Sequence, residues 1–170
     1  MDIVLVAAPE TAWLDGVHAL VAAGVARGEA LGFVDPPSGA DYRRSLDPLL
    51  DRSAAVNGGV VAALVDDRVV GTAQWSRSPY TTRRVLAELD RVAVAPDARR
   101  GGVGRRVVEA ALADAAAHGV EVVVLEVRGD NHGAIALYER CAFTRAGLIP
   151  NAVAIGVSRY DLVLMARPLP

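Results

Sequence analysis

The stretch that most constrains the fold runs from Val92 to Gly104 and has the sequence VAVAPDARRGGVG. It begins as an apolar strand, passes Pro96, and reaches a glycine-rich segment at residues 101–104. Beyond this segment, apolar residues recur at helical spacing until Gly119. We therefore expect a strand, a tight loop and a helix in direct succession, as in folds where helices pack on a sheet.

Such a junction is suited to binding a phosphate group. Glycines let backbone N–H groups approach an anion closely, and a helix N-terminus adds about half a positive charge. Arginine can form two parallel hydrogen bonds with a phosphate, and four arginines flank the loop: Arg99, Arg100, Arg105 and Arg106. The structural alternative is an ordinary glycine-rich helix start whose arginines face water.

The rest of the chain has the pattern of a mixed α/β fold. We expect strands at 3–8, 60–65, 69–75, 85–95, 120–127, 143–149 and 159–165, and helices at 11–27, 41–52, 102–118 and 131–141. Residues 66–68 predict a tight turn, the segment 91–94 suits a bulge, and a loop should join the last two strands. The β-branched run at 120–127 predicts a central strand buried on both faces. This order favours a mainly antiparallel sheet with one parallel helical crossover.

Composition excludes several classes of function. The net charge of −2 lacks the basic excess of nucleic-acid-binding proteins, and the absence of lysine excludes a P-loop hydrolase and Schiff-base chemistry. The single cysteine, Cys141, excludes a disulfide framework and a cysteine-built zinc site, so we expect no metal. No apolar run reaches the roughly 18 residues of a membrane span, and no signal peptide is visible. We expect a cytoplasmic protein without nucleic-acid or membrane partners.

These features together resemble the GCN5-related N-acetyltransferase (GNAT) superfamily. Its loop signature, Arg/Gln-x-x-Gly-x-Gly/Ala, is matched by Arg99, Gly102 and Gly104, and the preceding Val-x-Pro is matched by Val94 and Pro96. A second family element is matched in and after the following helix by Asn131, Ala134, Leu137, Tyr138, Glu139 and Phe143. Both elements occur at the separation that the family uses.

Two positions depart from the family pattern. Arg100 and Ala142 stand where the family often has glycine, so we expect the helix before Phe143 to end in a different way. The resemblance is strongest over residues 85–143 and implies a single acetyltransferase domain over residues 1–170. It also implies a mixed sheet of about six to seven strands flanked by about four helices.

The resemblance implies transfer of an acetyl group from acetyl-CoA, as co-substrate, to an amine by direct attack. The pyrophosphate would lie on the amides of residues 100–104, and the pantetheine would pair with Val92 and Val94 as an extra strand. A backbone N–H near Val94 would polarise the acetyl carbonyl. The implied cofactor-binding residues are Val92, Ala93, Val94, Arg99, Arg100, Gly101, Gly102, Val103, Gly104, Arg105, Asn131, Ala134 and Tyr138.

Proton transfer requires a base for the attacking amine and an acid for the leaving thiolate. The resemblance implies Glu88 as the general base and Tyr138 as the acid, and Glu126 at the end of the central strand is a second candidate base. Asp90 shares a strand face with Glu88. Asn131 would bind the pantetheine, cap its helix, or do both. Each carboxylate could instead be an ordinary strand-end group, and Tyr138 a core aromatic.

The acceptor site is expected to form from three loops. Their acidic and aromatic side chains suit a cationic small amine, and the contributing residues are Gly32, Phe33, Asp35, Asp41, Tyr42, Trp75, Tyr80 and the segment 151–159. We expect Phe33, Trp75 and Asp90 to contact the acceptor. Residues 30–33 loosely resemble small-molecule resistance acetyltransferases of the tabtoxin and kasugamycin type. Acetylation of proteins or peptides and non-catalytic acyl-CoA sensing stay open as alternatives, as does a homodimer.

Overall fold

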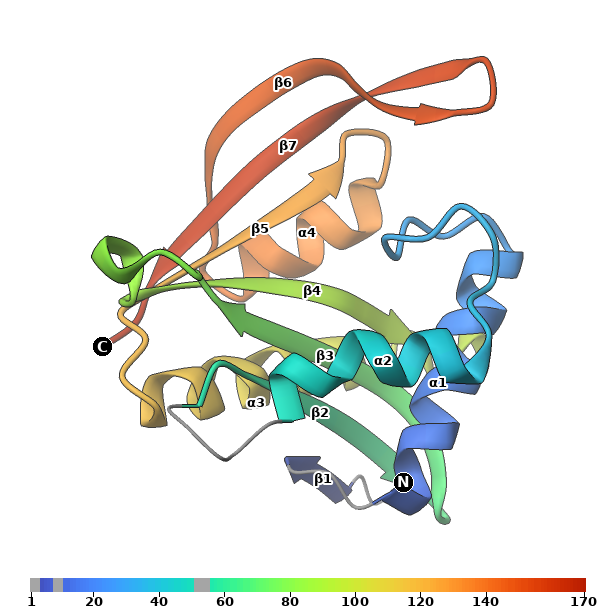
Figure 1. Cartoon of the computed structure of the whole chain (residues 1–170). Helices are drawn as coiled ribbons and strands as arrows, with labels where there is room; N and C mark the ends of the chain where they lie inside the picture. The colour runs from blue at the N-terminus through green and yellow to red at the C-terminus, as the bar shows by residue number, and fades with distance from the viewer. Residues whose placement is uncertain (1–3, 8–10, 51–55) are drawn as a thin grey trace.

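The computed structural model describes residues 4–7, 11–50 and 56–170 (Figure 1). The strands are β1 (Val4–Ala7), β2 (Gly58–Val65), β3 (Arg68–Arg77), β4 (Leu86–Val94), β5 (Val122–Arg128), β6 (Thr144–Ile155) and β7 (Ser158–Pro168). The α-helices are α1 (Thr11–Ala26), α2 (Gly39–Leu50), α3 (Val103–Ala117) and α4 (His132–Arg140), with 3-10 turns at Thr81–Arg83 and Pro96–Ala98. The predicted α/β class and order of elements are confirmed; residues 3, 8, 51 and 52 of the predicted elements lie outside the described residues.

The seven strands form one sheet in the order β1-β2-β3-β4-β5-β7-β6. Neighbouring strands are antiparallel except for β4 and β5, which are parallel and joined through α3. The predicted helical crossover is therefore confirmed. Pairing between β4 and β5 ends at Glu88 and Val124, and the two strands then separate (Figure 1). The sheet is split between its central strands.

Two irregularities in the N-terminal half follow from particular residues. Asp66 and Asp67 have positive φ angles of 48° and 58° and close the β2–β3 hairpin as a two-residue turn, so Arg68 already belongs to β3. In β4, the register with β3 shifts between Asp90 and Ala93, and Arg91 there has a φ of 45°. The predicted bulge is confirmed, and it re-aims the side chains around it.

Helices cover both faces of the sheet, with α1 and α2 on one face and α3 on the other (Figure 1). Successive residues of β3 therefore point to different helices. Trp75 faces α3, where its Nε1 donates a hydrogen bond of 2.7 Å to Oδ2 of Asp114. The fully buried Gln74 faces α2, where its amide donates to the hydroxyl of Tyr42.

Strand β5 alternates between buried and accessible residues. Val123, Leu125 and Val127 are buried, whereas Glu126 is exposed. The prediction that this strand is buried on both faces is wrong: Val122 and Val124, which share a face with Glu126, are only partly buried even where β4 pairs with them. The accessible face of β5 contributes to the site described below.

The C-terminal hairpin is longer than expected. Strand β6 continues to Ile155 and pairs with β7 through two register shifts, so the predicted loop over 150–158 is wrong. Pro150 and Asn151 lie within the second shift, where Asn151 has a φ of 55°. Because β6 is the outer strand of the sheet, no further strand lies on its free side to need the N–H that proline lacks. The turn itself is at 156–157.

None of the helices in the described ranges is both long enough and apolar enough to cross a membrane.

Candidate active site

A groove of about 920 Å³ opens where β4 and β5 separate. Its walls come from β4, the start of α3, β5, α4, the loop after α1 and the β6–β7 hairpin. It brings together most of the predicted site residues: Glu88, Asp90, Val92, Val94, Arg99, Arg100, Gly102, Val103, Gly104, Arg105, Glu126, Asn131, Ala134 and Tyr138. Gly101 does not line the groove, and Ala93 is buried.

Free backbone donors line one end of the groove. Helix α3 begins at Val103, and its first bond runs from the Arg106 N–H to the Gly102 carbonyl. The N–H groups of Val103, Gly104 and Arg105 therefore have no acceptor within the helix, and no side chain caps it. Gly102 has a φ of 78°, and a Cβ placed there meets no atom within 4 Å. The space over this helix end is open to an anion.

The glycine-rich loop is also shaped by close packing and backbone strain. A Cβ on Gly104 would lie 3.2 Å from Leu137 Cδ2 and 3.4 Å from Val94 Cγ2, so a larger residue would push α3 away from α4 and β4. Arg100 has a φ of 64°, the conformation that glycine adopts most readily. The loop thus accepts an arginine at this position at some cost in backbone strain.

Arg99 is held across the mouth of the groove. Its Nε donates to the Val94 carbonyl at 3.2 Å, and its Nη2 pairs with Oε1 of Glu29 at 2.6 Å. Glu29 also pairs with Arg27 at 3.0 Å. This contact ties the segment after α1 to the loop before α3.

Three carboxylates line the groove further back along the strands. Glu88 and Asp90 come from β4 and Glu126 comes from β5. Burial raises the pKa of Glu88, and the charges of Asp90 and Glu126 raise it further. Burial also raises the pKa of Asp90, against the opposing effect of Arg91. A general base works best when its pKa approaches the working pH, and both shifts are in that direction.

Tyr138 reaches the groove from α4. Its side chain is 8% exposed and packs edge-on against Phe143, with ring centroids 5.9 Å apart. Burial raises the pKa of Tyr138, and the charge of Asp90 adds to the effect. Its hydroxyl therefore keeps its proton at neutral pH. At the start of α4, Asn131 lines the groove and caps the helix by accepting the Ala134 N–H at 3.2 Å.

The end of α4 differs from expectation. The N–H of Ala142 bonds to the Glu139 carbonyl and that of Phe143 to the Tyr138 carbonyl, each at 3.0 Å. Ala142 has a φ of 59°. This is the helix end that glycine usually forms, so the expectation of a different ending is wrong. Alanine adopts the left-handed conformation instead, and it does so in a strained state.

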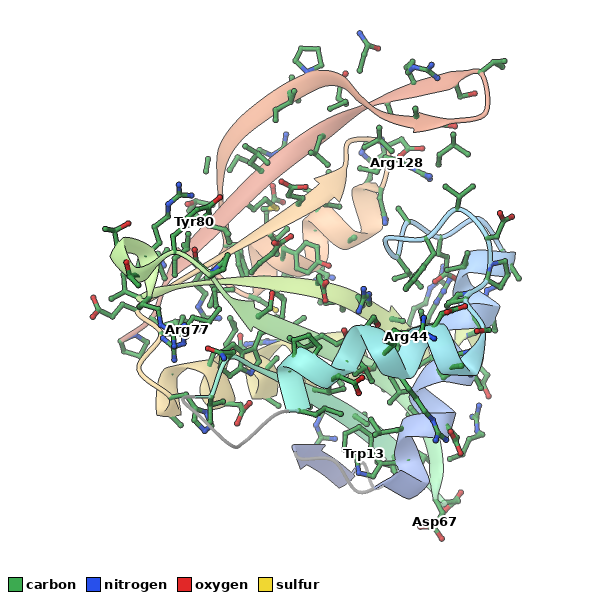
Figure 2. The ribbon with its side chains drawn as sticks, viewed as in Figure 1. Trp13, Arg44, Asp67, Arg77, Tyr80 and Arg128 are labelled. Carbon is green, nitrogen blue, oxygen red and sulfur yellow. The ribbon has the colours of Figure 1, made fainter. Side chains whose placement is uncertain are left out.

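None of the four aromatic residues expected at the acceptor lines the groove. Trp75 is 1% exposed and faces α3, so the prediction that it contacts the acceptor is wrong. Tyr42 is fully buried. Phe33 is half-buried and packs behind the groove wall against Tyr42 and the guanidinium of Arg91. Tyr80 lies well away from Arg128 of the groove (Figure 2).

Several lining residues had not been predicted: Glu29, Leu31, Arg91, Arg128, Arg140 and Leu162. Arg128 lies at the end of β5 (Figure 2). Its guanidinium carbon is 4.7 Å from the centroid of the Tyr160 ring, and its Nε pairs with Asp130. The predicted bulge was a signal for Arg91, because a bulge re-aims the side chains next to it. The others carry no local sequence signal.

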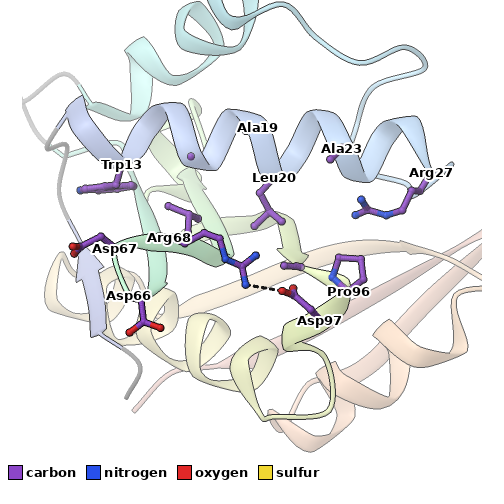
Figure 3. Close-up of a pocket in the computed structure, with 13 residues that line it drawn as sticks. Trp13, Ala19, Leu20, Ala23, Arg27, Asp66, Asp67, Arg68, Pro96 and Asp97 are labelled. Carbon is purple, nitrogen blue, oxygen red and sulfur yellow. Dashed lines mark hydrogen bonds and ion pairs between the residues drawn. The ribbon is translucent and has the colours of Figure 1, made fainter. Parts of the chain in front are cut away.

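A second cavity of about 560 Å³ lies beneath α1 (Figure 3). It extends from the β2–β3 turn to the segment after β4, and Arg68 pairs with Asp97 across it at 2.7 Å. None of the candidate catalytic residues lines it. The candidate catalytic residues therefore lie in the larger groove.

Comparisons with solved structures support the fold. The chain superposes on the ribosomal-protein-alanine N-acetyltransferase from Brucella melitensis with a TM-score of 0.86 and 24% identity, covering 98% of this chain and 99% of that one. It superposes on a GNAT superfamily phosphinothricin acetyltransferase from Sinorhizobium meliloti, solved with AcCoA, with a TM-score of 0.85 and 22% identity, covering 99% and 89%. At these identities the comparisons show a common fold.

Sequence comparisons go further. The chain is 39% identical over 83 residues to the [ribosomal protein bS18]-alanine N-acetyltransferase of Escherichia coli (strain K12). That match covers 49% of this chain and 56% of the relative, so the chain spans about half the length of the curated relative. A family model described as "Acetyltransferase (GNAT) family" matches residues 26–143. This match covers well over half of the chain, which therefore belongs to the GNAT acetyltransferase family.

Proposed function

We propose that the chain transfers the acetyl group of acetyl-CoA to the primary amine of a small molecule. The observation that carries the proposal is one continuous groove that joins an uncapped helix N-terminus to a group of carboxylates. The first feature suits the phosphates of the cofactor, and the second suits an amine that must lose a proton.

The cofactor would be held mainly by backbone groups. The N–H groups of residues 103–105 would bind the pyrophosphate. Directly after β4, the Ala95 N–H bonds to the Val70 carbonyl of β3. Alternation along a strand therefore directs the backbone groups of Val92 and Val94 away from β3, where the amides of the pantetheine could pair with them. Arg99, which now bonds the Val94 carbonyl, borders the same space.

Each step of the transfer has a residue positioned for it. Glu88 accepts a proton from the amine, directly or through water, and the amine nitrogen forms a bond to the acetyl carbon. A backbone N–H of β4 near Val94 stabilises the charge that develops on the acetyl oxygen. As the carbon–sulfur bond breaks, the nitrogen loses its second proton to water and Tyr138 donates its own proton to the leaving sulfur. Proton exchange with water then returns Glu88 and Tyr138 to their starting states. The products are an N-acetylated acceptor and free CoA.

A second candidate function is acetylation of a protein N-terminus. Two of the similar proteins reported above are named as acetyltransferases of a ribosomal-protein alanine, which favours it. A small-molecule acceptor is supported by the structural similarity to the phosphinothricin acetyltransferase. It is also supported by the hairpin residues Val153 and Leu162, which line the same groove as the carboxylates.

A turnover screen separates these functions. CoA release is measured with acetyl-CoA and a panel of amines, amino acids, aminoglycosides and peptides, with the Tyr138→Phe protein as control. We expect release with free small molecules and a much lower rate in the variant. Activity confined to peptides would instead assign a protein acceptor, and acetyl-CoA binding without turnover would identify a sensor.

A further inference from the structure

Arg91 is a cation held at the groove wall by neutral groups. Its Nη1 donates to Oε1 of Gln74 at 3.0 Å and to Oγ of Ser45 at 3.2 Å. Its guanidinium carbon lies 5.0 Å from the ring centroid of Phe33 and 5.8 Å from that of Tyr42. These contacts orient the guanidinium, but none of them supplies a full negative charge.

Within the described ranges, no carboxylate lies within 4.0 Å of the guanidinium nitrogens of Arg91. Two other arginines of the groove do have such partners: Arg99 pairs with Glu29, and Arg128 pairs with Asp130. The Nε of Arg91 is buried without a hydrogen-bond partner. The half-buried charge of Arg91 is thus balanced only by neutral contacts and by the more distant charge of Asp90, and an anionic ligand in direct contact would stabilise it further.

The position of the Arg91 side chain is fixed by its backbone conformation and by its buried partner. Its backbone has a φ of 45° in the β4 bulge, which turns the side chain toward the groove. Its partner Gln74 is fully buried and donates in turn to the hydroxyl of Tyr42, which is also fully buried. The guanidinium is therefore preorganised, and a ligand would meet it with little ordering cost.

We propose that Arg91 binds an oxyanion of the acceptor, so that the preferred acceptor carries a carboxylate close to its amine, as an α-amino acid does. This inference rests on the proposed function and names the acceptor class. Arg91 and Asp90 are adjacent in β4 and both line the groove. One small molecule can therefore place its amine at the Asp90 carboxylate and its own carboxylate at the Arg91 guanidinium. Nη2 of Arg91 forms no hydrogen bond within the described residues and can donate to one carboxylate oxygen of a ligand, whereas Nε is buried out of a ligand's reach.

The test compares matched acceptors and matched variants. L-leucine, L-methionine and L-glutamine are each assayed beside the corresponding α-amide, which keeps the amine but has no carboxylate. The ratio of kcat/KM for acid over amide is measured in the wild type, Arg91→Met and Arg91→Lys. We expect this ratio to fall roughly 10- to 100-fold in Arg91→Met, the usual range for a lost charge-assisted hydrogen bond. Arg91→Lys keeps the charge but lacks the planar guanidinium, so its ratio should lie between those of the wild type and Arg91→Met.

The amino acid and its amide differ in amine pKa, but this difference is the same for every variant. It therefore cancels when the acid-over-amide ratios of two variants are compared. Arg83→Met is the control, because Arg83 also stacks on an aromatic ring, that of Tyr80, but does not line the groove. Thermal melting verifies that each variant is folded. A ratio that is unchanged in Arg91→Met, or acid and amide activities that fall equally, would overturn the inference.

Calorimetry with CoA present repeats the comparison without turnover. If no amine is acetylated but the wild type binds L-leucine at least tenfold more tightly than Arg91→Met does, the proposed function fails and the inference stands. If the wild type binds none of the three acids, or binds acid and amide equally, the inference fails even where amines are acetylated.

Discussion

Glu88 and Val124 form the last residue pair between β4 and β5. The candidate base therefore lies at the point where the sheet opens. Beyond this pair the two strands no longer satisfy each other's backbone groups, which become available to a ligand. One interruption of strand pairing thus creates the groove and frees the edge of β4. It also leaves Glu88 accessible from the groove, which Asp90 and Glu126 line as well.

The first prediction concerns the pH dependence of the reaction. Because burial raises the pKa of Glu88, the side chain is protonated as pH falls through a value above the ordinary glutamate pKa. Wild-type kcat/KM should decline below that pH, since the protonated acid cannot accept a proton. In Glu88→Gln, kcat should be roughly 10²-fold lower near neutral pH and should recover in alkali as the amine deprotonates. Steady-state kinetics from about pH 4.5 to 10 measure both profiles.

Asp90→Asn and Glu126→Gln are the matched controls for that experiment. Loss of a charge that only binds the amine should raise the acceptor KM and leave kcat unchanged. If Glu88→Gln retains wild-type kcat across the range while Glu126→Gln loses it, the assignment of the base to Glu88 is wrong.

The second prediction concerns cofactor binding. Gly102→Glu places a carboxylate over the N-terminus of α3, where the pyrophosphate is expected, and should weaken acetyl-CoA binding at least about tenfold. Isothermal calorimetry measures the Kd. Gly119→Glu is a matched control, because Gly119 also has a positive φ and open space but lies beyond the other end of α3. Equal Kd values for wild type and Gly102→Glu would contradict the site.

The third prediction concerns the leaving group. Tyr138→Phe removes one hydroxyl and keeps the ring packed on Phe143. We expect kcat to fall by roughly 10²-fold with little change in the Kd of acetyl-CoA. Tyr80→Phe, at an exposed tyrosine outside the groove, should behave as wild type. Full activity in Tyr138→Phe would leave this residue with a packing role only.

The fourth prediction concerns stability. Ala142 is exposed and strained at a φ of 59°, so Ala142→Gly should stabilise the protein by up to about 1 kcal/mol. Ala113→Gly, at an exposed position inside α3, should instead destabilise it by about 1 kcal/mol. Urea unfolding measures both changes. A loss of stability in Ala142→Gly would show that the conformation at residue 142 is not strained.

The junction before α3 was predictable because its signals are local. A positive φ at Gly102 and close packing at Gly104 are demands that glycine itself meets. The helical crossover between β4 and β5 could also be predicted, because parallel strands need a long connection and residues 102–118 have a clear helical period. Candidate site residues in these segments can therefore be named from the sequence, and the structure places most of them in one groove.

Other features depend on contacts between segments that lie far apart in the sequence. The alternation of β3 shows that Gln74 and Trp75 point to opposite faces, but not that helices cover both. Pro150 is tolerated inside β6 because that strand is at the sheet edge. The partners of Arg91 come from β3 and α2, which lie far from it in the sequence.

The most direct test of this account is a crystal structure of the protein with bound CoA. The account predicts diphosphate oxygens at about 3 Å from the backbone nitrogens of residues 103–105, and the CoA sulfur within reach of the Tyr138 hydroxyl. A diphosphate bound in the second cavity near Arg68, or a sulfur on the face of β4 away from Tyr138, would contradict it.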